Sequence, residues 1–234
     1  MTTRDSAPAP IFSERVYSNV GNPPLIELLD IGCSRLLDVG CGAGDNAVLV
    51  KSRCAQCDVV GITRSSAEAE IAQGRMAHCW VFDIEGDLPG PLATQVFDAL
   101  VFSHVLEHLR DPAVVLERFA RLLRSGGQVL IAIPNVLFWR TRLQFVLGRF
   151  EYQSTGTLDD THLRFFTYYT ADRYLLSKAS DLKMTYKSVT GSVPLWVLRR
   201  YVLPRKWSDC IDRWASRRWP NLFGGQVLIE AVKQ

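Results

Sequence analysis

The sequence predicts an α/β protein whose centre is a parallel, doubly wound sheet. Two observations support this prediction. Five short apolar runs between residues 35 and 133 alternate with helical stretches, which is the pattern of consecutive strand–helix–strand units. The first run is followed by a glycine-rich turn, Gly40 to Gly44, and then by a helix. A corner of this kind binds ligands in doubly wound sheets.

Each predicted strand is a short apolar run that contains β-branched or aromatic residues. The five early strands cover residues 35–39, 58–62, 79–82, 97–102 and 128–133. After Pro134 the alternation stops, and residues 135–168 form an aromatic-rich region with a long polar stretch. Two further strands are expected at residues 182–189 and 226–232.

The predicted helices are delimited by capping and stop signals. Ser65 or Ser66 can cap the helix after the second strand, and Asp111 followed by proline can start another. This later helix has a helical apolar stripe and is expected to end at Ser125-Gly126-Gly127. Further helical segments are expected at residues 45–53 and 170–179, and at 16–30 with an interruption at 21–24.

We expect one domain, residues 13–234, with insertions at about 135–168 and 191–221. Residues 1–12 are expected to be a disordered tail, and residues 1–10, which are rich in Ser, Thr, Ala and Pro, lack the apolar core of a secretion signal. No apolar run reaches the roughly 18 residues of a membrane-spanning helix. Beyond Cys54-x-x-Cys57 the six cysteines have no zinc-ligand spacing, so we expect reduced thiols, no metal and a cytoplasmic location.

The strand end and turn at residues 38–44 have the spacing D-x-G-x-G-x-G. A dinucleotide-binding turn has G-x-G-x-x-G instead. Asp38 with Gly40, Gly42 and Gly44 therefore resembles the first motif of the class I S-adenosylmethionine-dependent methyltransferases. The resemblance implies a Rossmann-like, mostly parallel sheet of seven strands with an antiparallel last strand. It also implies S-adenosylmethionine as the cofactor.

The resemblance further implies which residues bind this cofactor. The three glycines would face its methionyl part. Thr63 stands at the ribose position, where an acid is usual, so this contact is expected to be uncharged. Asp83 matches the acid that bonds the adenine amino group. The complete set expected at the cofactor is Asp38, Gly40, Gly42, Gly44, Thr63, Asp83, Ile84 against adenine, Ser103 and His104.

Two later segments also resemble methyltransferases. Residues 97–108, which end in Val105-Leu106-Glu107-His108, resemble the fourth-strand segment of the family, and place His104 at the methionine end of the cofactor. Residues 134–149 resemble MetW-like methyltransferase domains. Residues 158–167 resemble a segment of methyltransferases from surface-polysaccharide and natural-product pathways. The last resemblance implies a glycan or another small molecule as the methyl acceptor.

His104 and His162 are the candidate catalytic residues. His162 stands between Asp160 and Arg164, and an imidazole beside a carboxylate suits general-base catalysis. The alternative is a structural hydrogen-bond cluster, and the same alternative applies to Glu107 and His108. Methyl transfer can also proceed mainly through alignment of the reactants, so an enzyme need not have a base.

The positive charge is concentrated in one segment. The chain has a net charge of +3 and residues 191–220 have +5, so the rest has −2, which argues against nucleic acid as a partner. Within residues 196–219 tryptophans alternate with arginines, and Trp207, Trp214 and Arg218 can share one helix face. That face can bind the inner surface of an anionic membrane, cover the active site, join two subunits or pack on the domain.

Together these features predict a methyltransferase that methylates an oxygen, or less readily a nitrogen, of a small molecule or glycan. The alternative is a MetW-like accessory subunit that keeps the fold, lacks catalytic activity and acts on a partner enzyme. A nucleic-acid methyltransferase of the amino-methylating type is disfavoured, because no N/D-P-P-Y/F motif follows residues 97–102.

Overall fold

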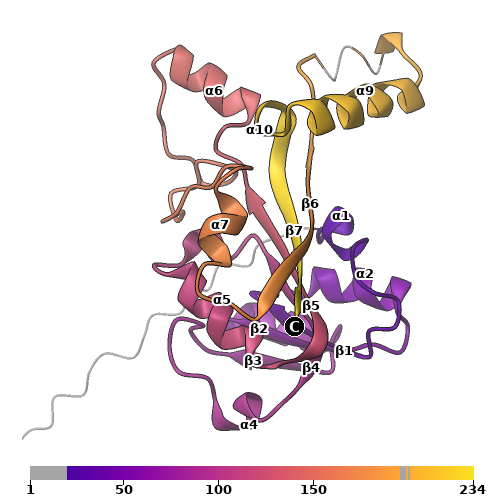
Figure 1. The fold of residues 1–234 in the computed structure, drawn as a ribbon, viewed down its shortest axis with the longest axis vertical. Coiled ribbons are helices and arrows are strands. Elements are labelled where there is room, and N and C mark those ends of the chain that lie inside the picture. The colour runs from indigo at the N-terminus through magenta and orange to yellow at the C-terminus, as the bar shows by residue number, and fades with distance from the viewer. Residues whose placement is uncertain (1–19, 196–198, 200) are drawn as a thin grey trace, which may run out of the picture.

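The computed structural model describes residues 20–195, 199 and 201–234. Its centre is one seven-stranded sheet with the order β3-β2-β1-β4-β5-β7-β6 (Figure 1). β7 pairs antiparallel with both neighbours and the other ladders are parallel, so the predicted fold class is confirmed. The strands are β1 (Arg35–Val39), β2 (Asp58–Thr63), β3 (His78–Val81), β4 (Phe97–Ser103), β5 (Leu123–Pro134), β6 (Leu182–Gly191) and β7 (Gly224–Lys233).

Helices lie on both faces of the sheet, as a doubly wound fold requires (Figure 1). A 3-10 turn, η1 (Leu106–His108), follows β4 directly. The helices are α1 (Pro23–Ile26), α2 (Asp45–Arg53), α3 (Ser66–Gln73), α4 (Gly90–Ala93), α5 (Pro112–Ala120), α6 (Trp139–Val146), α7 (Ala171–Leu175), α9 (Arg205–Arg218) and α10 (Pro220–Phe223).

Successive residues of β1 contribute to two separate hydrophobic cores. Leu36 packs in the core formed with α1 and α2, which includes Val50. Leu37 packs in the opposite core, which includes Phe119 of α5 and Leu175 of α7. Because β1 is buried on both faces, its sequence is a continuous apolar run rather than an alternating one. This burial fixes the carboxyl ends of β1 and β4 side by side, where the candidate site lies.

The end of α5 differs from the prediction. α5 ends at Ala120 because β5 begins at Leu123, which pairs with Phe97 of β4. Ser125-Gly126-Gly127 therefore lies within β5, where the pairing register shifts. A Cβ on Gly127 would lie 2.9 Å from the carbonyl oxygen of Asp98, so this glycine permits a close approach between two strands.

Three other segments differ from the predicted helices. The helical region expected at 16–30 is only α1, which begins at Pro23 because proline suits a first helical turn. Residues 16–19 and the tail predicted at 1–12 lie outside the described residues. α7 is shorter than the helix predicted at 170–179. α6 lies in the region of residues 135–168, for which no helix was predicted.

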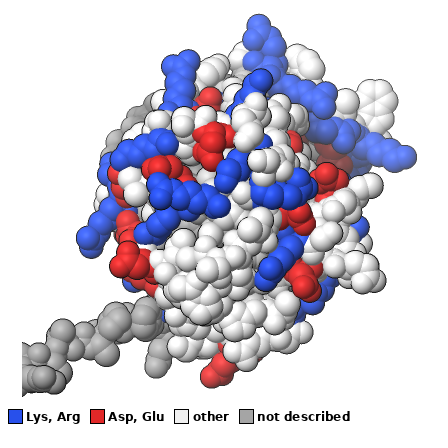
Figure 2. Space-filling view, turned by 60° about the horizontal axis from the view of Figure 1, so that its bottom comes forward, with Lys and Arg blue, Asp and Glu red and all other residues white. Residues whose placement is uncertain are grey.

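None of the helices in the described ranges is both long and apolar enough to cross a membrane. The six cysteines are free thiols, and all except Cys210 are buried. On the face drawn in Figure 2, Lys and Arg side chains are interspersed with Asp and Glu. That face therefore has no continuous surface of one charge.

Candidate active site

The glycine turn connects the carboxyl end of β1 to α2. Gly40, Gly42 and Gly44 have φ angles of +78°, +53° and +83°, which explains glycine at each position. A Cβ on Gly40 would collide with Val105, and one on Gly44 would lie 3.1 Å from Met76. A Cβ on Gly42 would meet, among the described residues, only Glu68, with Oε1 at 3.7 Å. Gly42 therefore lies at an open edge beside a carboxylate.

Asp38 is completely buried at the end of β1, and neither of its carboxylate oxygens has a hydrogen-bond partner within the described residues. Burial raises the pKa of Asp38 to about 7, against the opposing effect of the Asn46 amide. Burying an acid without a donor is costly. A cationic ligand at the turn would remove this cost, and S-adenosylmethionine carries both an ammonium and a sulfonium group. The residues of the turn therefore fit this cofactor.

Thr63 does not present a free hydroxyl at the expected ribose position. It is buried, and its Oγ1 donates to Glu68 Oε2 at 2.7 Å and accepts from the backbone N of Ser65 at 3.2 Å. The acid that the sequence lacks at the end of β2 comes from α3, where Glu68 places a buried carboxylate beside Gly42. The Ser65-x-x-Glu68 pattern indicates only a capped helix start, so it does not reveal this placement.

Asp83 and Ile84 follow β3 and have different environments. The Asp83 carboxylate accepts the backbone N of Glu85 at 3.0 Å and lies 3.8 Å from Arg64 Nη2, with about half of the side chain exposed. Ile84 is buried in the core that includes Leu37. The carboxylate of Asp83 is therefore accessible to a ligand. Ile84 is buried, so a ligand can contact only the small exposed part of its side chain. Their roles at adenine stay predictions.

His104 is the first residue after β4, and it has a left-handed backbone with φ of +56°. This conformation costs energy for any residue with a Cβ, and such strain is found mainly at functional sites. The backbone N of His104 donates to Ala132 at 2.9 Å, which anchors the loop to β5. Val105, the next residue, fills the space against Gly40, so His104 lies beside the glycine turn.

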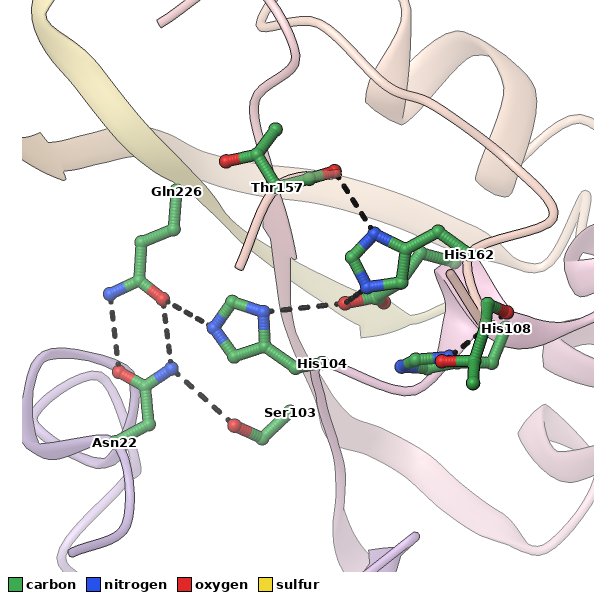
Figure 3. A network of polar contacts seen from close by, with 9 residues as sticks. Asn22, Ser103, His104, His108, Thr157, His162 and Gln226 are labelled. Carbon is green, nitrogen blue, oxygen red and sulfur yellow. Dashed lines mark hydrogen bonds and ion pairs between the residues drawn. The ribbon is translucent and has the colours of Figure 1, made fainter. Parts of the chain in front are cut away.

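The ring of His104 contacts two polar side chains (Figure 3). Nδ1 lies 3.3 Å from Glu107 Oε1, and Nε2 lies 2.9 Å from Gln226 Oε1 of β7. Burial acts to lower the pKa of His104, but Glu107 and Gln226 outweigh it and raise this pKa. Gln226 also accepts from Asn22 Nδ2 at 3.0 Å, and that Nδ2 lies 3.4 Å from Ser103 Oγ. Ser103 and His104 thus belong to one network.

His162 faces the same carboxylate as His104, that of Glu107. Its Nε2 lies 4.0 Å from Glu107 Oε1, and its Nδ1 lies 3.1 Å from the carbonyl oxygen of Thr157. Burial lowers the pKa of His162. The carboxylate partner of His162 is therefore Glu107 rather than its sequence neighbour Asp160, which is exposed. Both candidate catalytic histidines meet at Glu107, for which the sequence left a structural and a functional role open.

The comparisons with known proteins agree with this geometry. A family model described as a methyltransferase domain matches residues 15–174. Because this is more than half of the chain, the protein belongs to that family. With its strand order and its glycine turn, it is a class I S-adenosylmethionine-dependent methyltransferase, and S-adenosylmethionine is its cofactor. The MetW-like assignment within this class stays a prediction.

Three similar proteins illustrate the range of the family. An O-methyltransferase, rstn1, from Aspergillus nomiae is 30% identical over 129 residues, which are 52% of this chain and 54% of that protein. Ajmaline N-methyltransferase from Rauvolfia serpentina is 33% identical over 102 residues, 41% of this chain and 34% of that protein. A crystal structure of an S-adenosylmethionine-dependent methyltransferase from Archaeoglobus fulgidus has a TM-score of 0.57 at 20% identity, covering 86% of this chain and 87% of that one. This chain spans about half the length of the curated relatives it matches, or less.

We expect Asp38→Asn to change how the stability of the ligand-free protein depends on pH. The pKa of Asp38 is raised from 3.8 to about 7, so the folded state binds this proton more tightly. Its stabilising contribution is complete below the unfolded pKa and is lost as the pH rises through the folded one. Urea unfolding between about pH 5 and about pH 8 should show the wild type losing stability relative to the variant. A difference in unfolding free energy between wild type and variant that does not change with pH would contradict the raised pKa of Asp38.

We expect Gly42→Ala and Gly40→Ala to separate ligand binding from folding. In Gly42→Ala the new Cβ would point into the open edge of the turn, and the positive φ would cost about 1–2 kcal/mol of backbone strain. This Cβ would occupy space proposed for the ligand, so S-adenosylhomocysteine binding should weaken by about tenfold or more. The Gly40 Cβ would collide with Val105, so that variant should lose more stability. Urea unfolding and titration calorimetry measure the two effects. Unchanged affinity in Gly42→Ala would show that the ligand lies elsewhere.

Proposed function

We propose that this protein transfers a methyl group from S-adenosylmethionine to a hydroxyl oxygen of a small molecule or glycan. The observation that supports this most directly is the convergence of His104 and His162 on the buried Glu107, beside the glycine turn. When bound, the cofactor supplies a methyl group on a positively charged sulfur. The remaining requirements are met by the side chains of this chain.

The cofactor would be held by acids around the turn. Asp38 would face a cationic group of the cofactor, because it is buried without a donor. Glu68, beside Gly42, would accept hydrogen bonds from the ribose in place of Thr63, whose hydroxyl already donates to that carboxylate. Asp83 would accept from the adenine amino group. Binding therefore fixes the position of the methyl group relative to His104.

His104 is suited to hold the proton that a hydroxyl group must lose. Its side chain is 43% exposed, whereas that of Glu107 is 0% exposed. In the neutral ring one of the two nitrogens carries no proton, and that nitrogen would take the proton of the hydroxyl group. The imidazolium that forms is stabilised by Glu107 at Nδ1 and by Gln226 at Nε2. A neutral amine already has a nucleophilic lone pair, so a built general base favours an oxygen acceptor. The O-methyltransferases among the relatives support this choice.

The acceptor would lie against the region of residues 135–168. In this region the ring of Phe150 contacts two other aromatic rings, with centroids 5.6 Å from Phe145 and 5.4 Å from Tyr152. All three are exposed. Aromatic faces of this kind bind the apolar face of a sugar or another planar ring. We therefore propose an acceptor that combines a ring with a hydroxyl group.

We expect His104→Gln to lower the rate of methyl transfer by about 10²-fold or more, since a general base contributes that much. The affinity for S-adenosylhomocysteine should change far less, because Asp38 and the turn are untouched. Methyl transfer from labelled S-adenosylmethionine to a panel of hydroxyl-bearing glycans and phenols measures the first quantity, and calorimetry measures the second.

The same experiment addresses the non-catalytic alternative. His78→Gln, at an exposed histidine of β3, is the control for changes unrelated to the network. A wild-type protein that binds neither S-adenosylmethionine nor S-adenosylhomocysteine would favour the MetW-like accessory subunit. Transfer at an unchanged rate in His104→Gln would exclude this residue as the base.

We also propose that α9 binds an anionic membrane surface, which suits a lipid-linked acceptor. Trp207 and Trp214 are 68% and 60% exposed, so neither packs fully on the domain. Arginines and a lysine accompany them along the helix, and Arg218 lies over the ring of Trp219. This combination is typical of interfacial helices. Trp196, at the start of the predicted segment, lies outside the described residues.

We expect the protein to co-sediment with vesicles that contain anionic lipid, and to do so less at high salt. Replacing Trp207 and Trp214 together by alanine should abolish binding, whereas Tyr174→Ala, at an exposed aromatic residue of α7, should not. Analytical ultracentrifugation decides the competing role as a homodimer contact. A dimer that the double variant disrupts, with no vesicle binding by the wild type, would overturn the membrane proposal.

A further inference from the structure

We propose that Glu107, His108 and His162 form a binding site for a divalent transition-metal ion such as Zn²⁺. One donor atom from each of these residues lies within 4.8 Å of the other two. The prediction of no metal depends on the cysteine spacing, which says nothing about histidine and glutamate ligands. These ligands instead come from two segments that meet only in the folded chain, η1 and the loop around His162.

The hydrogen bonds of both histidines leave one ring nitrogen free for a metal. His162 Nδ1 donates to the carbonyl oxygen of Thr157 at 3.1 Å, so its neutral ring has the lone pair on Nε2, toward Glu107. The hydroxyl of Thr161 donates to Asp159 at 2.5 Å, so it must accept from His108 Nδ1 at 2.9 Å. The lone pair of His108 is then also on Nε2. Metal-binding histidines typically have this arrangement.

Glu107 supplies the negative charge at the centre of the cluster. Its side chain is 0% exposed, and neither carboxylate oxygen has a hydrogen-bond partner within the described residues. Its nearest polar neighbours are imidazoles, with His104 Nδ1 at 3.3 Å and His162 Nε2 at 4.0 Å. His104 Nδ1 can offer this carboxylate a proton, whereas the lone pair on His162 Nε2 faces it, and a buried negative charge against a lone pair is electrostatically unfavourable. A divalent cation between them would satisfy all three groups.

The backbone holds the two segments together independently of any ion. The amide nitrogens of Leu163 and Arg164 donate to the carbonyl oxygen of Glu107 at 2.9 and 3.0 Å. Arg164 also donates through its guanidinium to the carbonyl oxygen of Arg110. The main-chain hydrogen bonds made by the two residues after His162 therefore hold His162 against η1. This preorganisation is what a metal site needs, because the ligands do not have to be collected on binding.

The ligand set indicates both the class of ion and its use. Two imidazoles and one carboxylate suit Zn²⁺ or a similar transition ion better than Mg²⁺, which prefers oxygen ligands. Three protein ligands leave at least one coordination position open. A hydroxyl oxygen in that position would have a lowered pKa. The role of the ion in lowering the pKa of a hydroxyl group rests on the proposed function, which supplies the hydroxyl acceptor. The binding of the ion itself does not depend on the proposed function.

The test is metal binding by the full-length, chelator-treated protein. Equilibrium dialysis against Zn²⁺, with metal analysis, should give one ion per chain for the wild type and for the control His78→Gln. His108→Gln and His162→Gln should each weaken binding by about 100-fold or more. Co²⁺ should give a visible spectrum of a site with nitrogen and oxygen ligands, without the intense charge-transfer band of thiolate ligation.

Thr161→Val keeps the inference testable if the histidine variants do not fold. Thr161 is not a ligand, but its hydroxyl is one of two acceptors for the proton on His108 Nδ1, at 2.9 Å. Its carbonyl oxygen, at 3.3 Å, stays in the variant, so Zn²⁺ binding should weaken by only about 3–10-fold. No bound Zn²⁺ in the wild type, or equal binding by wild type, His108→Gln and Thr161→Val, would overturn the inference. S-adenosylhomocysteine calorimetry on the same samples separates the two proposals, since metal binding without cofactor binding would contradict only the proposed function.

Discussion

The buried carboxylate of Glu107 is the constraint on which the candidate site depends. A carboxylate with no exposed surface needs hydrogen-bond donors or a cation close by, because burial in a protein interior otherwise costs several kcal/mol. In this chain three of the four histidines gather around it, from the strained loop after β4, from η1 and from the loop at residue 162. Side chains from segments that are far apart in sequence therefore meet at one buried carboxylate, and main-chain hydrogen bonds to Glu107 hold the loop of His162 there.

A second concentration of negative charge lies at the glycine turn. Asp38 and Glu68 are both buried there, although the acidic groups of a stable protein are usually placed in solvent. The two cores on either side of the sheet supply the stability that permits this. Such sites trade stability for binding, because the carboxylate of Asp38, which is unfavourable in the empty protein, would be satisfied by a cationic ligand.

The fold was predictable because its signals are local. The apolar run of β1, the glycine spacing and the alternation of strands with helices each occupy adjacent residues. The site was predictable only in part, since its decisive contacts join residues that are distant in sequence. Asp160 is the acid next to His162 in the chain, but folding brings Glu107 to it instead. In the same way, the sequence offered Thr63 for the ribose, and only the packing of α3 places Glu68 beside Gly42. The predicted end of α5 was wrong because the pairing of Leu123 with Phe97 in the sheet outweighed the apolar helical stripe in the sequence.

The insertion of β7 between β5 and β6 has a consequence for biosynthesis. Gln226, which orients His104 and bonds to Asn22, enters the site only when this last strand joins the sheet. A nascent chain that has emerged as far as β6 has its glycine turn and both histidines. In that chain β6 has no neighbour to pair with, and His104 lacks Gln226, one of its two partners. The central strands can fold during translation, but the site is completed only after residue 226 leaves the ribosome. The order of synthesis thus delays a working site until all seven strands of the sheet have been made.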